Sequence, residues 1–96
     1  MRPTPFQLSV LESVTAMPDR SIRGRRTMGG LGLGKIGVYS KSLRLFVKTL
    51  SVDSIVSMKR RGLIEEKTPD DAFCIWELTE EGRRFGKAAQ TQQSRR

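Results

Sequence analysis

The chain of 96 residues contains no histidine and only one cysteine, Cys74. Histidine is the commonest general base in enzymes and a frequent metal ligand, so its absence removes both roles. A single cysteine excludes an internal disulfide and leaves no recognisable zinc site. We therefore expect a protein that is not an enzyme and that binds no metal or cofactor. The lack of a disulfide framework is typical of the reducing cytoplasm.

Long apolar runs are also missing. Hydrophobic residues make up only 36% of the chain, and no stretch approaches the length of a membrane-spanning helix. The segment MRPTPFQLSV at the N-terminus lacks the apolar centre of a signal peptide. These properties predict one small cytoplasmic domain with a modest core and no membrane partner.

Carboxylates are absent from one long stretch of the chain. The net charge is +8, and residues 20–48 hold eight cations and no acid. These cations are Arg20, Arg23, Arg25, Arg26, Lys35, Lys41, Arg44 and Lys48. A field of one sign attracts polyanions such as nucleic acid. The alternative is a solvated basic loop that only keeps the protein soluble.

The glycine-rich sequence MGGLGLGKIG, residues 28–37, matches most of the phosphate-binding pattern G-x-x-x-x-G-K-[ST]. Ile36 stands where a P-loop needs a Ser or Thr hydroxyl to hold magnesium. Gly37 would also weaken a helix that began there. We predict no nucleotide site and interpret residues 19–40 as a flexible basic insertion rich in Gly and Arg.

Helices are predicted in three places before residue 63. Thr4 and Gln7 form a capping box for a helix over residues 4–17, which Pro18 ends. Residues 41–48 fit a helix or an extended segment, and a short helix is favoured. Ser51 caps a third helix over residues 51–61. Gly62 and Leu63 are placed to close that helix with a Schellman motif. Its predicted inner side carries Val52, Ile55, Val56 and Met58.

Two short strands, residues 63–67 and 73–78, follow with a turn at Pro69 between them. Thr79 then caps a further helix, with Glu80 and Glu81 at its positive end. Residues 90–96 are polar, and we expect a disordered tail there.

The segments SIVSMKRRGLIEE and WELTEEGRRF together resemble winged helix-turn-helix domains of bacterial regulators of the MarR and PadR groups. The matching motifs are Gly62-Leu63-Ile64 after a basic helix end, and Leu78-Thr79-Glu80-Glu81-Gly82 at the start of the next helix. The resemblance covers residues 51–86 well, residues 4–17 loosely, and residues 19–40 not at all. It implies an α+β fold in which residues 1–89 form a single winged-helix domain with a two-stranded wing.

The function implied by the resemblance is sequence-specific or semi-specific binding of double-stranded DNA by a transcriptional regulator. Residues 51–61 would be the recognition helix, and regulators of this kind commonly form homodimers. Small serines permit close approach to bases, and arginines reach phosphate or guanine. The alternative for this helix is a solvated face. The predicted DNA-binding residues are Ser54, Ser57, Arg60, Arg61, Arg23, Arg25, Arg26, Lys35, Lys41 and Arg44.

The predicted wing is acidic, which departs from the resemblance. Residues 63–81 hold Lys67 against seven carboxylates. Phosphate would be repelled by Glu65, Glu66, Asp70 and Asp71. The rival hypothesis is therefore a protein-interaction module on the same scaffold, using the acidic wing or the basic loop. A phage or plasmid could encode such a module to inhibit a host nucleic-acid-handling complex.

Overall fold

Local capping signals set the ends of the helices, and pairing between distant segments builds the sheet. The computed structural model describes residues 2–27 and 33–94. In these residues the chain forms a small α+β domain with three helices and a five-stranded antiparallel sheet. The elements are α1 (Pro5–Ala16), β1 (Arg20–Arg26), β2 (Leu33–Ser40), β3 (Leu45–Thr49), α2 (Val52–Arg60), β4 (Ile64–Lys67), β5 (Phe73–Leu78) and α3 (Glu80–Ser94).

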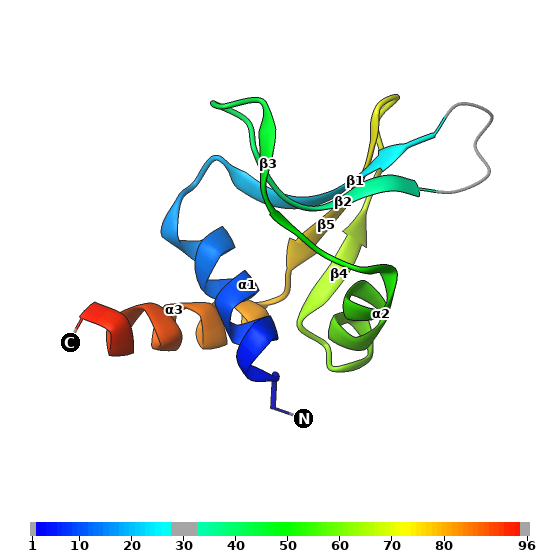
Figure 1. The fold of residues 1–96 in the computed structure, drawn as a ribbon. Coiled ribbons are helices and arrows are strands. Elements are labelled where there is room, and N and C mark those ends of the chain that lie inside the picture. Colours follow the sequence, from blue (N-terminus) through cyan, green and yellow to red (C-terminus); the bar gives the residue numbers. More distant parts are fainter. Residues whose placement is uncertain (1, 28–32, 95–96) are drawn as a thin grey trace.

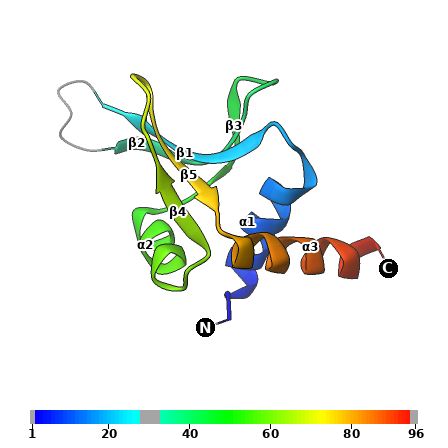
Figure 2. The same cartoon turned by 180° about the vertical axis from the view of Figure 1, so that it is seen from behind.

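The sheet has the strand order β3-β2-β1-β5-β4, which places β1 at its centre. The described helices all lie on one face of the sheet, which we call the inner face (Figures 1 and 2). The β2–β3 and β4–β5 turns rise on the opposite side, the outer face. Ile22 on β1 pairs with Val38 on β2 and Trp76 on β5. All three are buried and form one row on the inner face.

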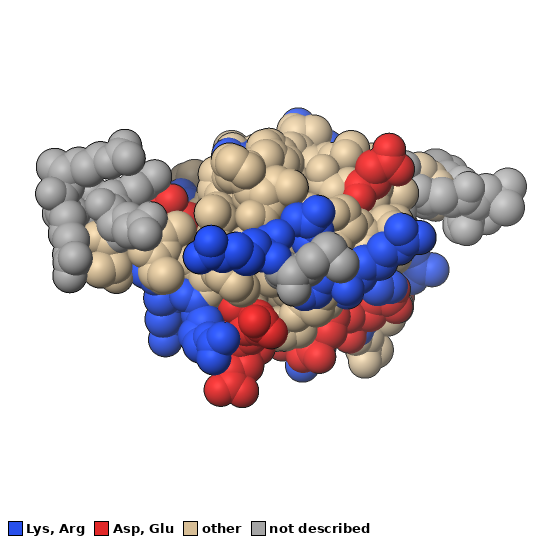
Figure 3. Space-filling view, turned by 90° about the horizontal axis from the view of Figure 1, so that it is seen from below, with Lys and Arg blue, Asp and Glu red and all other residues tan. Residues whose placement is uncertain are grey.

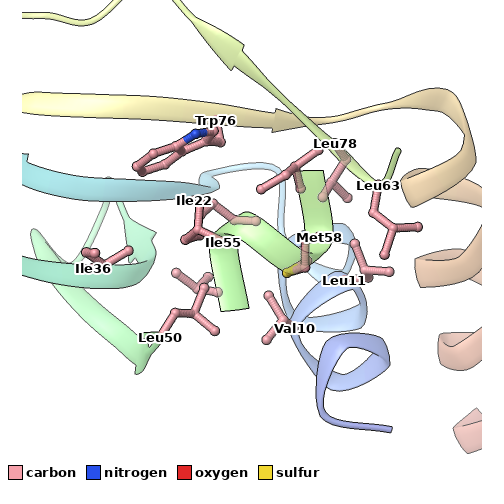
Figure 4. Packing of buried hydrophobic residues seen from close by; sticks show 12 residues of the cluster. Val10, Leu11, Ile22, Ile36, Leu50, Ile55, Met58, Leu63, Trp76 and Leu78 are labelled. Carbon is pink, nitrogen blue, oxygen red and sulfur yellow. The ribbon is translucent and has the colours of Figure 1, made fainter. Parts of the chain in front are cut away.

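The hydrophobic core lies between this inner face and the helices (Figure 4). It includes Val10 and Leu11 of α1, Ile55 and Met58 of α2, and Ile22, Ile36 and Trp76 of the sheet. Burial of an apolar side chain of this size stabilises a fold by about 2 kcal/mol. The core therefore joins the basic strands to the helix that resembles a recognition helix.

The predicted beginning of α1 is confirmed. The Gln7 N–H donates to Thr4 Oγ1 at 3.2 Å, and the Thr4 N–H donates to Gln7 Oε1 at 3.0 Å. These two bonds form the capping box and satisfy donors that the first turn leaves free.

Both predicted ends of α2 are confirmed as well. The Ser51 hydroxyl accepts from the Ser54 N–H at 3.1 Å. At the other end Gly62 has a φ of 71°, a left-handed conformation that glycine adopts readily. The N–H of Leu63 donates to the Met58 carbonyl at 3.0 Å. This is the bond expected of a Schellman motif.

The strands β4 and β5 lie where the sequence predicts them and pair antiparallel, from Ile64 opposite Leu78 to Lys67 opposite Ile75. However, β5 also pairs with β1 along its other edge. The hairpin is therefore one side of the five-stranded sheet and not a free two-stranded wing.

The interpretation of residues 19–40 as a flexible insertion is wrong for the parts that the structure describes. Residues 20–26 and 33–40 are β1 and β2, paired with each other in the sheet. Residues 28–32 lie outside the described part of the chain. The inward positions on β1 are Ile22 and Gly24, and those on β2 are Ile36 and Val38. Glycine and arginine in this stretch hide an alternation that a richer apolar composition would have shown.

The short helix favoured for residues 41–48 is also wrong. Residues 41–44 form a turn in which Arg44 has a φ of 57°, and β3 begins at Leu45. Leu43 and Leu45 are 63% and 47% exposed, so these apolar side chains do not cover the core. Within residues 17–27 and 33–51 there is no helix, whereas a helix-turn-helix would place one just before α2.

The expectation of a disordered tail from residue 90 is wrong up to Ser94, where α3 ends. Residues 95 and 96 lie outside the described residues.

Candidate nucleic-acid interface

The outer face of the sheet carries none of the described helices. Because neighbouring residues of a strand point to opposite faces, burial of Ile22 and Gly24 on the inner face turns Arg23 and Arg25 outward. Tyr39 on β2 is outward for the same reason, since it follows the buried Val38. The basic strand β1 therefore presents Arg23 and Arg25 on the side without helices.

Three aromatic rings from three strands meet on this outer face. The Tyr39 ring lies 5.2 Å from the Phe46 ring of β3 and 4.9 Å from the Phe73 ring of β5, centroid to centroid. The Phe46 and Phe73 centroids are 6.3 Å apart. Such edge and tilted arrangements are favourable between aromatic rings. We call Tyr39, Phe46 and Phe73 the aromatic cluster.

Three predicted DNA-binding cations lie over the aromatic cluster. The Arg23 guanidinium carbon is 5.3 Å from the Tyr39 centroid, and the Arg25 guanidinium carbon is 5.3 Å from the Phe73 centroid. Lys35 Nζ lies 5.9 Å from the Phe46 centroid. These are cation–π distances, each worth about 0.5–1 kcal/mol at an exposed site. The rings thus hold the positive charges in place without neutralising them.

Arg23 is the most enclosed of these cations, with a side chain only 12% exposed. Its Nε donates to Ser21 Oγ at 2.9 Å, and its Nη1 lies 4.0 Å from Asp70 Oδ2. Arg25 and Lys35 are exposed. Arg23 is thus held within the face, whereas the other two cations are accessible to solvent.

Asp70 in the β4–β5 turn is a structural carboxylate. Its Oδ1 accepts from the N–H of Phe73 at 2.6 Å and of Ala72 at 2.8 Å. These backbone bonds, with smaller effects from Arg23 and Arg26, hold the pKa of Asp70 below its ordinary value. Arg26 Nη1 also donates to the Asp70 carbonyl at 3.0 Å. Arg26 is thus engaged by the turn, although it lies at the end of the same strand.

The acidic residues predicted to repel DNA or bind a partner are only partly free to do so. Glu66 Oε1 accepts from Lys59 Nζ of α2 at 2.5 Å, and Asp70 holds its own turn. Glu65 and Asp71 are exposed. On the same side of the sheet, Lys67 and Glu77 form an ion pair at 3.1 Å. The hairpin β4–β5 therefore balances part of its charge internally.

The residues predicted on the recognition helix are separated from the basic strands, because α2 lies on the inner side of the sheet (Figure 1). Ser57 Oγ accepts from Gln7 Nε2 at 2.9 Å, so this serine faces α1. Arg61 Nη1 donates to the Arg2 carbonyl at 2.7 Å. Ser54 shares a hydrogen bond with the capping Ser51. Of these four predicted residues, only the exposed Arg60 has no such contact among the described residues.

The predicted inner side of α2 is also partly wrong. Ile55 and Met58 are buried as expected, but Val52 is 57% and Val56 44% exposed. Viewed from the helix side, cations and carboxylates are mixed on the surface (Figure 3). That side lacks the single-signed field of β1 and β2.

Lys41 and Arg44 lie in the β2–β3 turn and are exposed. Asp19 anchors this turn, because its Oδ2 accepts from the hydroxyls of Ser42 at 2.6 Å and Ser40 at 2.7 Å. Donation from Ser42, and then from Ser40, lowers the pKa of Asp19 from 3.8 to about 2. The turn rises on the outer side (Figures 1 and 2), so its two cations belong to the same side of the molecule as Arg25.

The sequence does not predict the aromatic cluster. Tyr39, Phe46 and Phe73 are separated by long stretches of sequence, so only the strand order brings them together. Lys35 was considered as part of a phosphate loop, but it lies within β2 and not at the start of a helix. Cys74 is half-buried and packs against the core, as a structural thiol would.

Comparisons with protein-family models, with curated proteins and with solved structures each return no match for this chain. Among residues 2–27 and 33–94, no helix combines the length and the apolar character needed to cross a membrane.

Proposed function

We propose that this protein binds nucleic acid through the outer face of β1, β2 and β3. The observation that carries the proposal is the arrangement of Arg23, Arg25 and Lys35 over the aromatic cluster on a face that no described helix covers. A flexible cation loses rotamer freedom when it binds phosphate. Cations already held by rings lose less, so the same charges give a stronger contact.

The charges around this face support a polyanionic ligand. Arg23, Arg25 and Lys35 lie on this face, and Lys41 and Arg44 extend the positive side to the β2–β3 turn. Arg20 and Lys48, the cations of residues 20–48 that contact α1, belong to the inner side. Contacts between cations and phosphate release counterions, which makes binding steeply dependent on salt. An acidic protein would also be attracted, but it would not supply the regular phosphate spacing that several cations can meet together.

A finer proposal is a winged-helix transcriptional regulator that binds double-stranded DNA with α2. The order α2, β4–β5 hairpin and α3 supports it. So does a contact between the two motifs of the resemblance: Thr79 Oγ1 donates to the Gly62 carbonyl at 2.5 Å. Because Ser57 and Arg61 are engaged by the N-terminal segment, α2 offers fewer free groups to a major groove than the outer face offers to phosphate.

A protein-interaction module remains the second candidate. Val52 and Val56 project from α2 into solvent, at 57% and 44% exposure. Exposed apolar residues on one helix are typical of contacts between proteins. In this case a partner would bind on the inner side, away from the aromatic cluster.

The proposal is tested by fluorescence anisotropy with labelled mixed-sequence oligonucleotides, single- and double-stranded, over a salt series. We expect Arg25→Gln with Lys35→Gln to weaken binding about tenfold at low salt and to reduce the salt slope by about 1 per lost contact. Arg83→Gln with Arg84→Gln on α3 removes the same charge elsewhere and is the matched control. Equal effects of the two double variants would show that net charge alone acts, and the outer-face proposal would be wrong.

A third variant, Arg60→Gln, tests the contribution of α2. If it alters duplex binding more than the pair on the outer face does, the winged-helix placement is favoured. Val52→Ser with Val56→Ser should leave nucleic-acid binding unchanged. If no oligonucleotide binds the unaltered protein, the proposed nucleic-acid-binding function is wrong, and the protein-interaction module becomes the favoured function.

A further inference from the structure

We infer that the nucleic acid bound by the outer face is single-stranded DNA, with a base stacked over Arg25 and Phe46. This inference rests on the function proposed above and adds the class of ligand. It follows from the width of the face, from the stacking surface and from the position of the exposed cations.

The width of the binding face excludes entry into a duplex groove. The aromatic cluster and its cations come from four adjacent strands, β3, β2, β1 and β5. Strands are spaced by about 4.8 Å, so four of them span about 14 Å between backbones alone. The major groove of B-DNA is about 12 Å wide and the minor groove about 6 Å. A duplex could therefore offer this face only its phosphates, whereas a single strand can lie across it.

The turns beside the outer face also favour a single strand over a duplex. The β2–β3 and β4–β5 turns rise on opposite sides of the outer face (Figures 1 and 2). A rigid duplex laid on the strands would meet these turns first. A flexible single strand can pass between them and reach the aromatic cluster.

The stacking surface is a guanidinium supported by rings. The Arg25 guanidinium carbon lies 5.3 Å from the Phe73 centroid and 6.0 Å from the Phe46 centroid. Arg25 is exposed and Phe46 is half-buried. Unpaired bases stack on aromatic rings and on arginine planes, and every base has such a surface. One base can thus lie against Arg25 and Phe46 while its phosphate meets Lys35.

The chemistry of the face favours DNA over RNA as the strand. A protein that distinguishes RNA must engage the ribose 2′-hydroxyl. The nearest serine hydroxyl on β1, that of Ser21, already accepts from Arg23 Nε, and the Asp70 carboxylate is held by its own turn. The exposed groups, Arg25 and Lys35, are donors that meet phosphate. Among the outward side chains of β1 and β2, the hydroxyl besides that of Ser21 belongs to the half-buried Tyr39, so a 2′-hydroxyl would find this one partner there.

The experiment compares labelled oligothymidine, the duplex that it forms with oligoadenosine, and oligouridine of the same length, all with the full chain. We expect the single DNA strand to bind most tightly. Phe46→Leu keeps an apolar side chain but removes the ring, and should weaken single-strand binding about tenfold. The same change should alter duplex binding less than twofold.

Phe6→Leu is the matched control, because Phe6 also lies beneath a cation, with Lys48 Nζ 5.6 Å from its centroid, but belongs to α1. It should leave all binding unchanged. Arg25→Lys keeps the charge and removes the plane, so it should selectively weaken the single strand. This surface variant decides the question if Phe46→Leu fails to fold in a melting experiment.

Several results would overturn the inference. Equal binding of single strand and duplex, with no effect of Phe46→Leu or Arg25→Lys, would leave the function standing but remove the single-strand assignment. Tighter binding of the duplex would do the same. Tenfold tighter binding of oligouridine would replace DNA by RNA as the ligand. Absence of all binding would remove the proposed function itself.

Discussion

Strands β1–β3 and the segment from α2 to α3 handle their charges in opposite ways. In the second region carboxylates and cations pair within the fold, as Lys59 does with Glu66 and Lys67 with Glu77. In β1–β3 the exposed cations Arg25 and Lys35 lie over aromatic rings instead. A ring steadies a cation without cancelling its charge. The exposed cations of β1–β3 therefore keep their positive charge, whereas the second region pairs its charges within its own structure.

The two regions also differ in how they are held together. From α2 to α3 the contacts connect nearby turns: the Thr79 N–H donates to the Leu63 carbonyl at 3.0 Å, and the Gly82 N–H to Thr79 Oγ1 at 3.1 Å. In β1–β3 the strands depend on cross-strand pairing. At one point β2 and β3 come so close that Gly37 leaves no room for a side chain, because a Cβ would overlap the Lys48 carbonyl oxygen.

The largest loss of stability is expected from Gly37→Ala, which tests whether close pairing of β2 and β3 holds this region together. The added methyl group must push β3 away from β2, and we expect a loss of about 3 kcal/mol in the free energy of unfolding. Urea unfolding followed by fluorescence of the single, buried Trp76 measures it. Gly34→Ala on the same strand is the control, since its nearest non-neighbouring atom would be at 3.6 Å, an ordinary contact. Similar losses in both variants would show that β2 tolerates no side chain for another reason.

The difference in contacts explains which parts of the fold could be predicted. The capping box of α1, both ends of α2 and the strands β4 and β5 follow from signals within a few residues, and these are confirmed. Where β1, β2 and β3 lie, the sequence predicts an insertion and a short helix, because the structure of these strands depends on partners far away in the chain. Gly24 fills an inward position of β1 where an apolar residue would have revealed the alternation.

Part of the candidate site could likewise be predicted from the sequence, and part depends on contacts between distant segments. Charge alone predicts Arg23, Arg25 and Lys35 as binding residues, and the structure brings them together over the aromatic cluster. The aromatic cluster beneath them was not foreseen, since Tyr39, Phe46 and Phe73 meet only through strand order. The residues selected on α2 were chosen from a helical wheel, which contains no information about Gln7 and Arg2 on the neighbouring segment.

A smaller effect is expected from Thr79→Val, which tests whether the two motifs of the second region act as a unit. The change keeps the shape of the side chain but removes the hydroxyl that bonds to Gly62 and caps the Gly82 N–H. We expect a loss of about 1–2 kcal/mol in urea unfolding. Thr79→Ser keeps the hydroxyl and should lose less. If valine and serine are equivalent, packing and not hydrogen bonding joins the motifs.

The smallest effect concerns the β2–β3 turn, which Asp19 anchors, and it appears as a dependence on pH. The folded pKa of Asp19 is about 2, below its ordinary 3.8, because Ser42 and Ser40 donate to the carboxylate. A depressed pKa stabilises the fold above the unfolded value, and this contribution disappears as pH falls from about 4 to about 2. We expect Ser42→Ala to be less stable than the unaltered protein at neutral pH, and the difference to shrink over that range. Asp19→Asn should remove the same part of the pH dependence, whereas Ser54→Ala, whose hydroxyl contacts no carboxylate, should retain it. A constant difference between Ser42→Ala and the unaltered protein from pH 7 to pH 2 would show that the serine acts by packing, and that the carboxylate does not hold the turn.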